Sequence, residues 1–198
     1  MFIDYVPLLL LNMAAGLILL AGYVLKGIDS SDQKKWGAGF LISGLVALVF
    51  GAHMVLTWPL PGSYNIAFGQ TSVLLGVLFL GAGLSLVNNW NLLSVAIYGF
   101  FAANIAIIIG LRIISLKMTK EPLMSGIGFI LTGLSGILIL PALNWKKLKG
   151  LRIIIAVFLV CAALIWLRTC YGAYWHHLGS FSVIFPRKSG HKEELVLA

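Results

Sequence analysis

Six long runs of apolar residues alternate with short polar segments along the chain. The runs occupy 6–25, 37–57, 71–87, 92–111, 123–143 and 153–173. A bilayer core about 30 Å thick needs roughly 20 helical residues per crossing, which is close to the length of each run. The runs are continuously apolar and show no period-2 alternation, which favours helices over a membrane β-barrel. The pattern therefore predicts an all-α integral membrane protein with six transmembrane helices.

The segments between the runs are short, so we expect one transmembrane domain over 1–175. A polar C-terminal tail over 176–198 follows, with basic residues at Arg187, Lys188 and Lys192. The first five residues carry Asp4 and no Lys or Arg, whereas a cleaved signal peptide begins with a cationic leader. We therefore expect the first run to stay in the membrane.

Composition excludes several other classes of protein. Of the 198 residues, 60% are apolar and 10% are charged, against about 45–50% and 25% in an ordinary soluble domain. A soluble fold of this size has too little interior for that apolar surface, and a disordered chain has far less of it. The 2 cysteines, Cys161 and Cys170, lie nine residues apart on one predicted helix, too far apart to bridge each other.

Charged residues are almost confined to the segments outside the runs. Arg168 is the one Lys or Arg inside a run, and all six carboxylates lie outside, as the high cost of a charge in the bilayer requires. The net charge is +8, but the cations flank apolar runs and do not alternate with aromatic residues. This arrangement predicts contact with anionic lipid headgroups and no nucleic-acid partner.

The distribution of cations also predicts an orientation. Seven Lys and Arg residues flank the segments between the first and second runs and between the fifth and sixth runs: Lys26, Lys34, Lys35, Lys146, Lys147, Lys149 and Arg152. Three flank the connection between the fourth and fifth runs on the opposite side: Arg112, Lys117 and Lys120. Because cytoplasmic loops carry the excess of Lys and Arg, we expect the two termini outside and a location in the cytoplasmic (inner) membrane.

A nine-residue motif occurs twice. Residues 37–45 read GAGFLISGL, and residues 126–134 read GIGFILTGL. Looser similarities relate the first run to the fourth and the third to the sixth, so the chain divides into two three-helix halves. Because three is odd, the second half has to be inverted relative to the first. The sequence thus predicts a 3+3 inverted repeat, an arrangement found in many transporters.

Small residues recur every four positions within both copies of this motif. The small-residue faces consist of Gly39, Ser43, Ala47 and Gly51 in the second run, and of Gly128, Thr132 and Gly136 in the fifth. Such faces let helix backbones approach closely in lipid. They predict helix packing, either inside the six-helix bundle or against another subunit.

A few polar residues fall inside the runs and are candidate functional residues. They are Asn12, His53, Tyr98, Asn104 and Arg168. His53 is the most interesting, because an ionisable group in the membrane is a functional candidate by default. A helix-to-helix hydrogen bond is its simplest role. As a haem or quinone ligand it would act with His176 or His177, the histidines after the last run. We predict no metal site and no cofactor, with haem as the weaker alternative.

The segment between the second and third runs carries much of a resemblance to a known family. The matching stretches are His53-Met54, the uncharged loop 58–69 (WPLPGSYNIAFG) and residues 120–123 (KEPL). They resemble a family of small bacterial and archaeal multi-pass membrane proteins that is classed only as a domain of unknown function. The resemblance covers 1–175 and implies a prokaryotic source and a self-contained fold, but no activity. The stiff loop itself is expected either to cap the bundle or to present a docking surface.

These features favour a non-catalytic protein. The runs offer scattered hydroxyls and one histidine, without the nucleophile, base and metal ligands that a membrane hydrolase needs. We expect an accessory or structural subunit that packs within a larger membrane assembly, beside other membrane subunits or copies of itself. The alternative is an oligomeric channel or small-solute transporter built on inverted repeats. A haem- or quinone-binding redox subunit is a third, weaker expectation.

Overall fold

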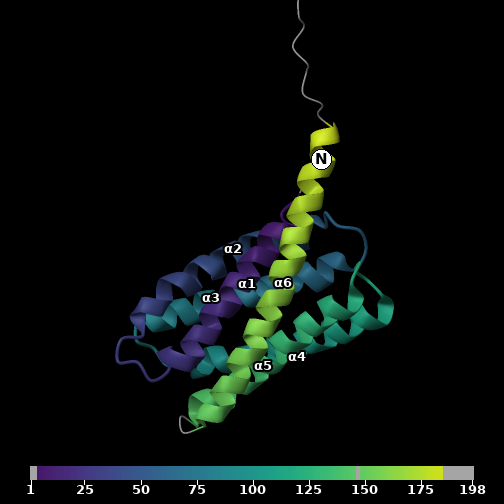
Figure 1. The fold of residues 1–198 in the computed structure, drawn as a ribbon. Coiled ribbons are helices and arrows are strands. Elements are labelled where there is room, and N and C mark those ends of the chain that lie inside the picture. The colour runs from purple at the N-terminus through teal and green to yellow at the C-terminus, as the bar shows by residue number, and fades with distance from the viewer. Residues whose placement is uncertain (1–3, 146–147, 185–198) are drawn as a thin grey trace, which may run out of the picture.

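The computed structural model describes residues 4–145 and 148–184, with side chains through Gly179. Its six main helices are α1 Val6–Gly22, α2 Gly37–Thr57, α3 Thr71–Val87, α4 Leu93–Leu116, α5 Pro122–Asn144 and α6 Lys149–Ile184 (Figure 1). A π-helical turn prolongs α1 through Gly27, and another precedes α3 from Asn65. In the part of the chain that the structure describes, all six helices are long and apolar enough to cross a membrane.

The helices form a ring in chain order. Each helix packs against the next one, and α6 returns to α1. The closest neighbours are the two hairpins α2–α3 and α4–α5, while α1 and α6 lie side by side between them (Figure 1). The contact between α3 and α4 is much looser than either hairpin, so the ring has a weak seam on the side opposite α1 and α6.

Glycines bring the backbones of each hairpin together. A Cβ on Gly44 of α2 would lie 2.6 Å from the backbone nitrogen of Leu80 in α3. A Cβ on Gly133 of α5 would lie 2.6 Å from the carbonyl oxygen of Ala103 in α4. Because lipid provides no hydrophobic drive for helix association, this close backbone contact is the main attraction within each hairpin.

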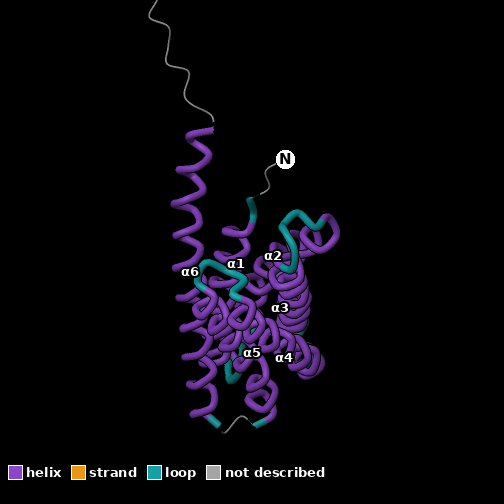
Figure 2. Tube along the Cα trace, turned by 90° about the vertical axis from the view of Figure 1, so that its right-hand side faces the viewer, coloured by secondary structure: helices purple, strands orange, loops and turns teal. Residues whose placement is uncertain are grey.

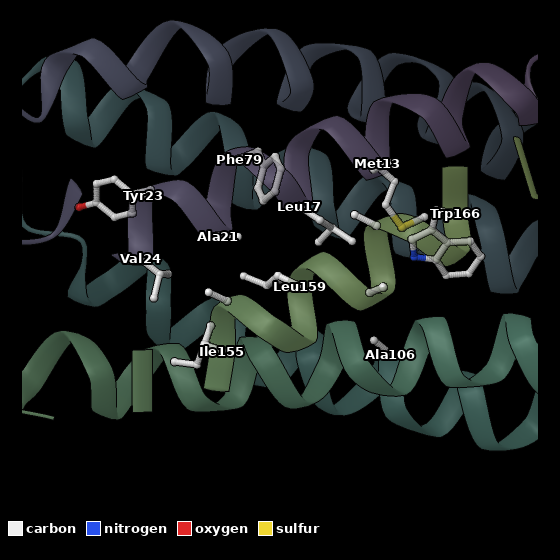
Figure 3. Close-up of a cluster of buried hydrophobic side chains, with 14 of the residues drawn as sticks. Met13, Leu17, Ala21, Tyr23, Val24, Phe79, Ala106, Ile155, Leu159 and Trp166 are labelled. Carbon is white, nitrogen blue, oxygen red and sulfur yellow. The ribbon is translucent and has the colours of Figure 1, made fainter. Parts of the chain in front are cut away.

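The middle of the ring is filled by large side chains from several helices. Leu17 of α1, Phe79 of α3 and Leu159 of α6 gather there, and Trp166 lies further along α6 (Figure 3). Trp166 and Phe129 meet edge to face with ring centroids 5.1 Å apart. Such aromatic pairs contribute beyond their buried area and join α5 to α6.

The last helix is longer than its apolar run. α6 begins four residues before the predicted run 153–173 and continues to Ile184, past the position where the sequence places the start of the tail. Its 36 residues correspond to about 54 Å at 1.5 Å per residue, far more than a 30 Å crossing. Figures 1 and 2 show α6 projecting beyond the other helices at the end where the N-terminus lies. Tail residues 185–198 lie outside the described residues.

The uncharged loop between α2 and α3 is organised by one buried side chain. Asn65 is fully buried; its Oδ1 accepts a hydrogen bond from the Leu60 backbone N–H at 3.0 Å, and its Nδ2 donates to the Leu60 and Gly62 carbonyls. Gly62 takes a positive φ of 56° at the tip, a conformation that suits glycine. Tyr64 donates to the Met118 carbonyl in the connection between α4 and α5. The loop thus ties the two hairpins together at this end.

Candidate functional site

His53 lies near the C-terminal end of α2, beside Tyr5, which precedes α1. Its Nδ1 is 3.3 Å from the Tyr5 hydroxyl and 3.4 Å from the Thr57 hydroxyl, and the His53 and Tyr5 rings meet edge to face. The Thr57 hydroxyl donates to the His53 carbonyl at 2.8 Å, so its proton is already used. Burial raises the pKa of the Tyr5 phenol, which keeps its proton available for donation. This arrangement favours the tautomer in which Nδ1 accepts from Tyr5 and the ring hydrogen lies on Nε2.

His177 reaches the same end of the bundle from α6. Its Nδ1 lies 2.6 Å from a carboxylate oxygen of Asp4, and this residue directly precedes Tyr5. The two-residue segment Asp4–Tyr5 therefore contacts both histidines, one through each side chain. We call Asp4, Tyr5, His53, Thr57 and His177 the terminal cluster. His176 is exposed beside it on α6, so the structure brings the three predicted histidines to one end of the molecule.

The other predicted polar residues serve individual helices or helix pairs. Asn12 donates to the Ser43 carbonyl at 2.9 Å and links α1 to α2. Asn104 donates to the carbonyl of Phe100, one turn earlier in its own helix, at 2.7 Å. Tyr98 is exposed on the outer surface of α4. Asn12 lies on α1, whereas Tyr98 and Asn104 lie on α4, and their printed hydrogen bonds do not join them into one polar site.

Within the described residues, three ion pairs join α6 to other segments of the chain. Arg152 pairs with Asp29 through two hydrogen bonds, at 2.5 and 3.2 Å, and is only 3% exposed. Arg168 pairs in the same two-pronged way with Glu121, the residue just before α5. His177 with Asp4 is the third pair, charged when the imidazole is protonated. All three acidic partners lie at helix ends, so these charges fasten chain segments to α6 at both ends of the bundle.

The small-residue face of α2 is used inside the bundle. Gly39 packs against α1 and Gly51 against α3, each so closely that an added Cβ would lie 2.8 Å from a neighbouring side chain. Ser43 and Ala47 between them are buried. This face therefore packs against the protein's own helices.

The corresponding face of α5 is used in the same way. Gly128 packs against Trp166 of α6, and Gly136 packs against Ala103 of α4. The Thr132 hydroxyl donates to the Gly128 carbonyl, one turn earlier, at 2.8 Å. Neither small-residue face is left on the outer surface for a partner.

A cavity of about 170 Å³ lies inside the ring of helices. Of its 28 lining residues, four carry a hydroxyl: Tyr23, Thr71, Ser72 and Thr132. Three of these hydroxyls donate to groups of the protein itself, to the Gln33 side chain and to carbonyls one turn back. The remaining lining is Gly, Ala, Val, Leu, Ile, Met and Phe. An apolar cavity of this kind stays dry, because water needs several polar partners.

Among the described residues, no group of three or more His, Cys, Asp or Glu side chains is placed to hold a metal ion. Cys161 is exposed and Cys170 is buried in α6, where its thiol donates to the Pro7 carbonyl at 3.3 Å. The terminal cluster offers a hydrogen-bonded histidine and the cavity offers an apolar space. Both are candidate ligand sites in the part of the chain that the structure describes.

Sequence reasoning missed the residues that organise the bundle. Asn65 and Tyr64 look like ordinary loop residues, and the polar, uncharged loop gives no hint of a buried amide. The partners of Arg168 and Arg152 are 47 and 123 residues away in the chain, so no local pattern reveals them. The sequence signal that could have found these pairs is the position of each acidic residue beside a helix end. A carboxylate there can pair with a cation on a neighbouring helix.

Comparison with known proteins identifies a family but no activity. No curated protein and no solved structure matches the chain. One family model matches residues 1–180, slightly more than the stretch over which the sequence resembles an uncharacterised family, and it confirms that resemblance. The chain belongs to the family described as "Protein of unknown function (DUF981)".

Proposed function

We propose that this protein is a non-catalytic membrane subunit that binds a larger membrane assembly through the projecting end of α6. The observation that carries the proposal is a row of exposed apolar side chains beyond the bundle. Tyr171, Trp175 and Leu178 are 63%, 81% and 70% exposed. Their spacing of four and three residues puts them on one face of the helix. We call these three residues the α6 stripe.

The position of the α6 stripe supports a protein partner. Arg168 marks the end of the bundle, since it pairs with Glu121 just before α5 begins. From Arg168 to Ile184 the helix rises about 24 Å. Cys170 still packs on Pro7 of α1, and Trp175 and Leu178 lie more than one helical turn further along α6. Apolar anchors at such spacing are how a helix is recognised in the groove of a partner. A second membrane subunit with an apolar groove at the bilayer surface fits this geometry.

The charges support a structural role over a coupled carrier. Asp4, Asp29 and Glu121 lie at helix ends and pair with α6. Proton- and sodium-coupled transporters usually need a carboxylate inside the membrane. The alternative of a channel or small-solute transporter also gains no support from the cavity, because its lining provides few groups to replace the hydration of a polar solute.

Native gel electrophoresis of membranes solubilised in mild detergent tests the proposal. Wild-type protein should migrate in a complex with another subunit, and Trp175→Ala with Leu178→Ala should shift most of it to the size of the free chain. Leu164→Ala on the same helix is the matched control, since Leu164 is also exposed but lies within the bundle. A chain that migrates alone, or only with copies of itself, in wild type and variants alike would contradict the accessory role.

The redox alternative depends on His53 and is tested in the same preparation. In the favoured tautomer, Nδ1 of His53 accepts from Tyr5 and Nε2 carries the ring hydrogen, which could donate to a quinone oxygen. A haem iron would need the other tautomer, with Nδ1–H donating to the Tyr5 oxygen and Nε2 free of hydrogen. We expect no Soret band after haem supplementation. A Soret band that His53→Leu abolishes would establish the redox role in place of the accessory one.

The location and the inverted repeat belong to the same proposal. We place the protein in a prokaryotic cytoplasmic membrane with its termini outside, from the excess of cations near the α1–α2 and α5–α6 connections. Support for inverted halves comes from α2 and α5, whose matched glycines play matched roles. However, Gly44 of α2 packs against the following helix, α3, whereas Gly133 of α5 packs against the preceding helix, α4. The two matched glycines therefore contact neighbours on opposite sides in the chain order. The inverted repeat stays a prediction.

A further inference from the structure

We propose that the cavity inside the ring holds one acyl chain of a membrane lipid, which enters between α3 and α4. This inference does not depend on the accessory role, because it concerns the opposite side of the bundle from the α6 stripe. The cavity is lined by all six helices. Its surroundings in the membrane are the acyl chains of the bilayer, so its occupant has to match their chemistry.

The shape of the cavity fits an extended chain. Its lining runs along α4 from Leu92 to Ala106 and along α5 from Phe129 to Leu143, about 21 Å in each case at 1.5 Å per residue. One leaflet of a bilayer core about 30 Å thick accounts for about 15 Å of hydrocarbon. A volume of about 170 Å³ spread over that length is a narrow slot. A space of this volume takes a segment of one acyl chain, since a cavity of about 150 Å³ takes a six-carbon molecule.

The chemistry of the lining excludes water and favours hydrocarbon. An apolar cavity of about 150 Å³ in another protein stays dry and takes up benzene. Three of the four hydroxyls here are already bonded within the protein. An empty space of this size also costs stability, because the lining loses its contacts on one side. A chain from the surrounding bilayer removes that cost.

The seam between α3 and α4 provides the entrance. These helices are the loosely packed neighbours in the ring. At the seam, Gly99 of α4 meets Leu78 of α3, and Gly81 of α3 meets Val95 of α4; a Cβ on either glycine would be 3.4–3.5 Å from its neighbour. Leu78, Val95 and Gly99 line the cavity and are also partly exposed. A chain in the lipid therefore reaches the cavity without displacing a close backbone contact.

The aromatic residues give the slot a closed end near the terminal cluster. Phe129 lines the cavity there and packs on Phe68, with ring centroids 5.9 Å apart, and on Trp166. Phe68 in turn stacks on Tyr64, whose hydroxyl ties the two hairpins together. The slot is thus open sideways to lipid and closed along the bundle axis at this end, as a lipid site requires.

Photolabelling of the full chain tests this site. The protein is reconstituted in vesicles of phosphatidylethanolamine and phosphatidylglycerol that contain a trace of phosphatidylcholine with a diazirine in one acyl chain. After irradiation, mass spectrometry should find adducts on lining residues such as Leu78 and Val95, besides outward residues such as Phe101. Filling the slot with Gly99→Leu should reduce the lining adducts about tenfold and leave the Phe101 adducts unchanged.

A control variant and a substitute variant complete the experiment. Gly172→Leu is the matched control, because nothing lies within 4 Å of a Cβ built there; it should change no lining adduct. If Gly99→Leu fails to fold, Ala102→Leu on the same lining replaces it. Adducts confined to outward residues, or lining adducts that persist in the filled variant, would overturn the proposal. A free fatty acid carrying the same diazirine that labels the lining while the phospholipid does not would also overturn it.

Discussion

Glu121 and Arg168 show how a single exposed ion pair sets the acid sensitivity of one helix contact. The hydrogen bonds from Arg168 lower the pKa of the Glu121 carboxyl below its usual value near 4.5. A carboxylate with a lowered pKa in the folded state stabilises the fold above its ordinary pKa, and this stabilisation is lost as the pH falls through the lowered value. Both side chains are largely exposed, so the effect is modest.

The first prediction follows from the loss of this stabilisation at low pH. Near pH 7, Glu121→Gln and Arg168→Gln should each lower the thermal unfolding midpoint in mild detergent by a small and similar amount. Below the lowered pKa of Glu121, where the carboxyl is protonated in the folded state as well, wild type and Glu121→Gln should unfold at the same temperature. A difference between them that is as large in acid as at neutral pH would show that the side chain acts through packing and not through charge.

Asn65 provides the second prediction at this scale. Asn65→Ala removes three hydrogen bonds and leaves the partly buried N–H and C=O of Leu60 without their side-chain partner, so we expect a loss of about 2–3 kcal/mol of stability. Asn88→Ala is the control, because that exposed amide bonds only to its own helix and should cost less than about 0.5 kcal/mol. Thermal unfolding in detergent measures both. Equal effects of the two variants would show that the buried amide does not organise the loop.

At the level of whole elements, the two hairpins depend on matched glycines. Gly44→Ala and Gly133→Ala each place a methyl group against backbone at 2.6 Å, which forces two helices apart. We expect each to cost about 1–3 kcal/mol, while Gly172→Ala, with open space around it, should be neutral or slightly stabilising because alanine favours helices. Unfolding midpoints of the three variants test this. Stable Gly44 and Gly133 variants would mean that the hairpins tolerate a wider separation.

Much of the helix content could be predicted from apolar runs, and the departures have physical causes. The runs 37–57 and 71–87 have the same bounds as α2 and α3. Two lysines precede the first run and a Trp-Pro pair follows it, while a π-helical turn precedes the second run and two asparagines follow it. The run 153–173 is shorter than α6, since a helix continues into polar residues once packing and ion pairs support it. No sequence pattern predicts the π-helical turn that begins at Asn65. The turn accompanies the hydrogen bonds from the Asn65 side-chain amide to the loop carbonyls.

The candidate site was only partly visible in the sequence for a similar reason. His53, His176 and His177 stand out as ionisable residues at helix ends, and they do gather at one end of the bundle. The segment that contacts His53 and His177, Asp4–Tyr5, lies outside every apolar run and becomes informative only when α2 and α6 are placed beside α1. The cavity depends on the loose seam between α3 and α4, which is a property of packing that no single run encodes.

At the scale of the whole molecule, the arrangement of charges predicts which end faces the cytoplasm. Ser31 lies in the connection between α1 and α2, and Ser63 lies in the loop between α2 and α3; both are exposed. With Cys161 and Cys170 changed to Ala, Ser63→Cys should react with a membrane-impermeant maleimide on intact cells. Ser31→Cys should react only after the membrane is opened. The reverse pattern would place the termini in the cytoplasm.

The three ion pairs on α6 have a consequence for the order in which the protein is made. α6 is the last of the described helices to leave the ribosome, yet it carries the basic partners of Asp4, Asp29 and Glu121. The five earlier helices therefore enter the membrane before these charges can be neutralised by α6. A nascent chain that stops before Lys149 has five apolar helices but lacks these ion pairs at both ends of the bundle. Assembly is completed late, when one helix joins segments synthesised long before it.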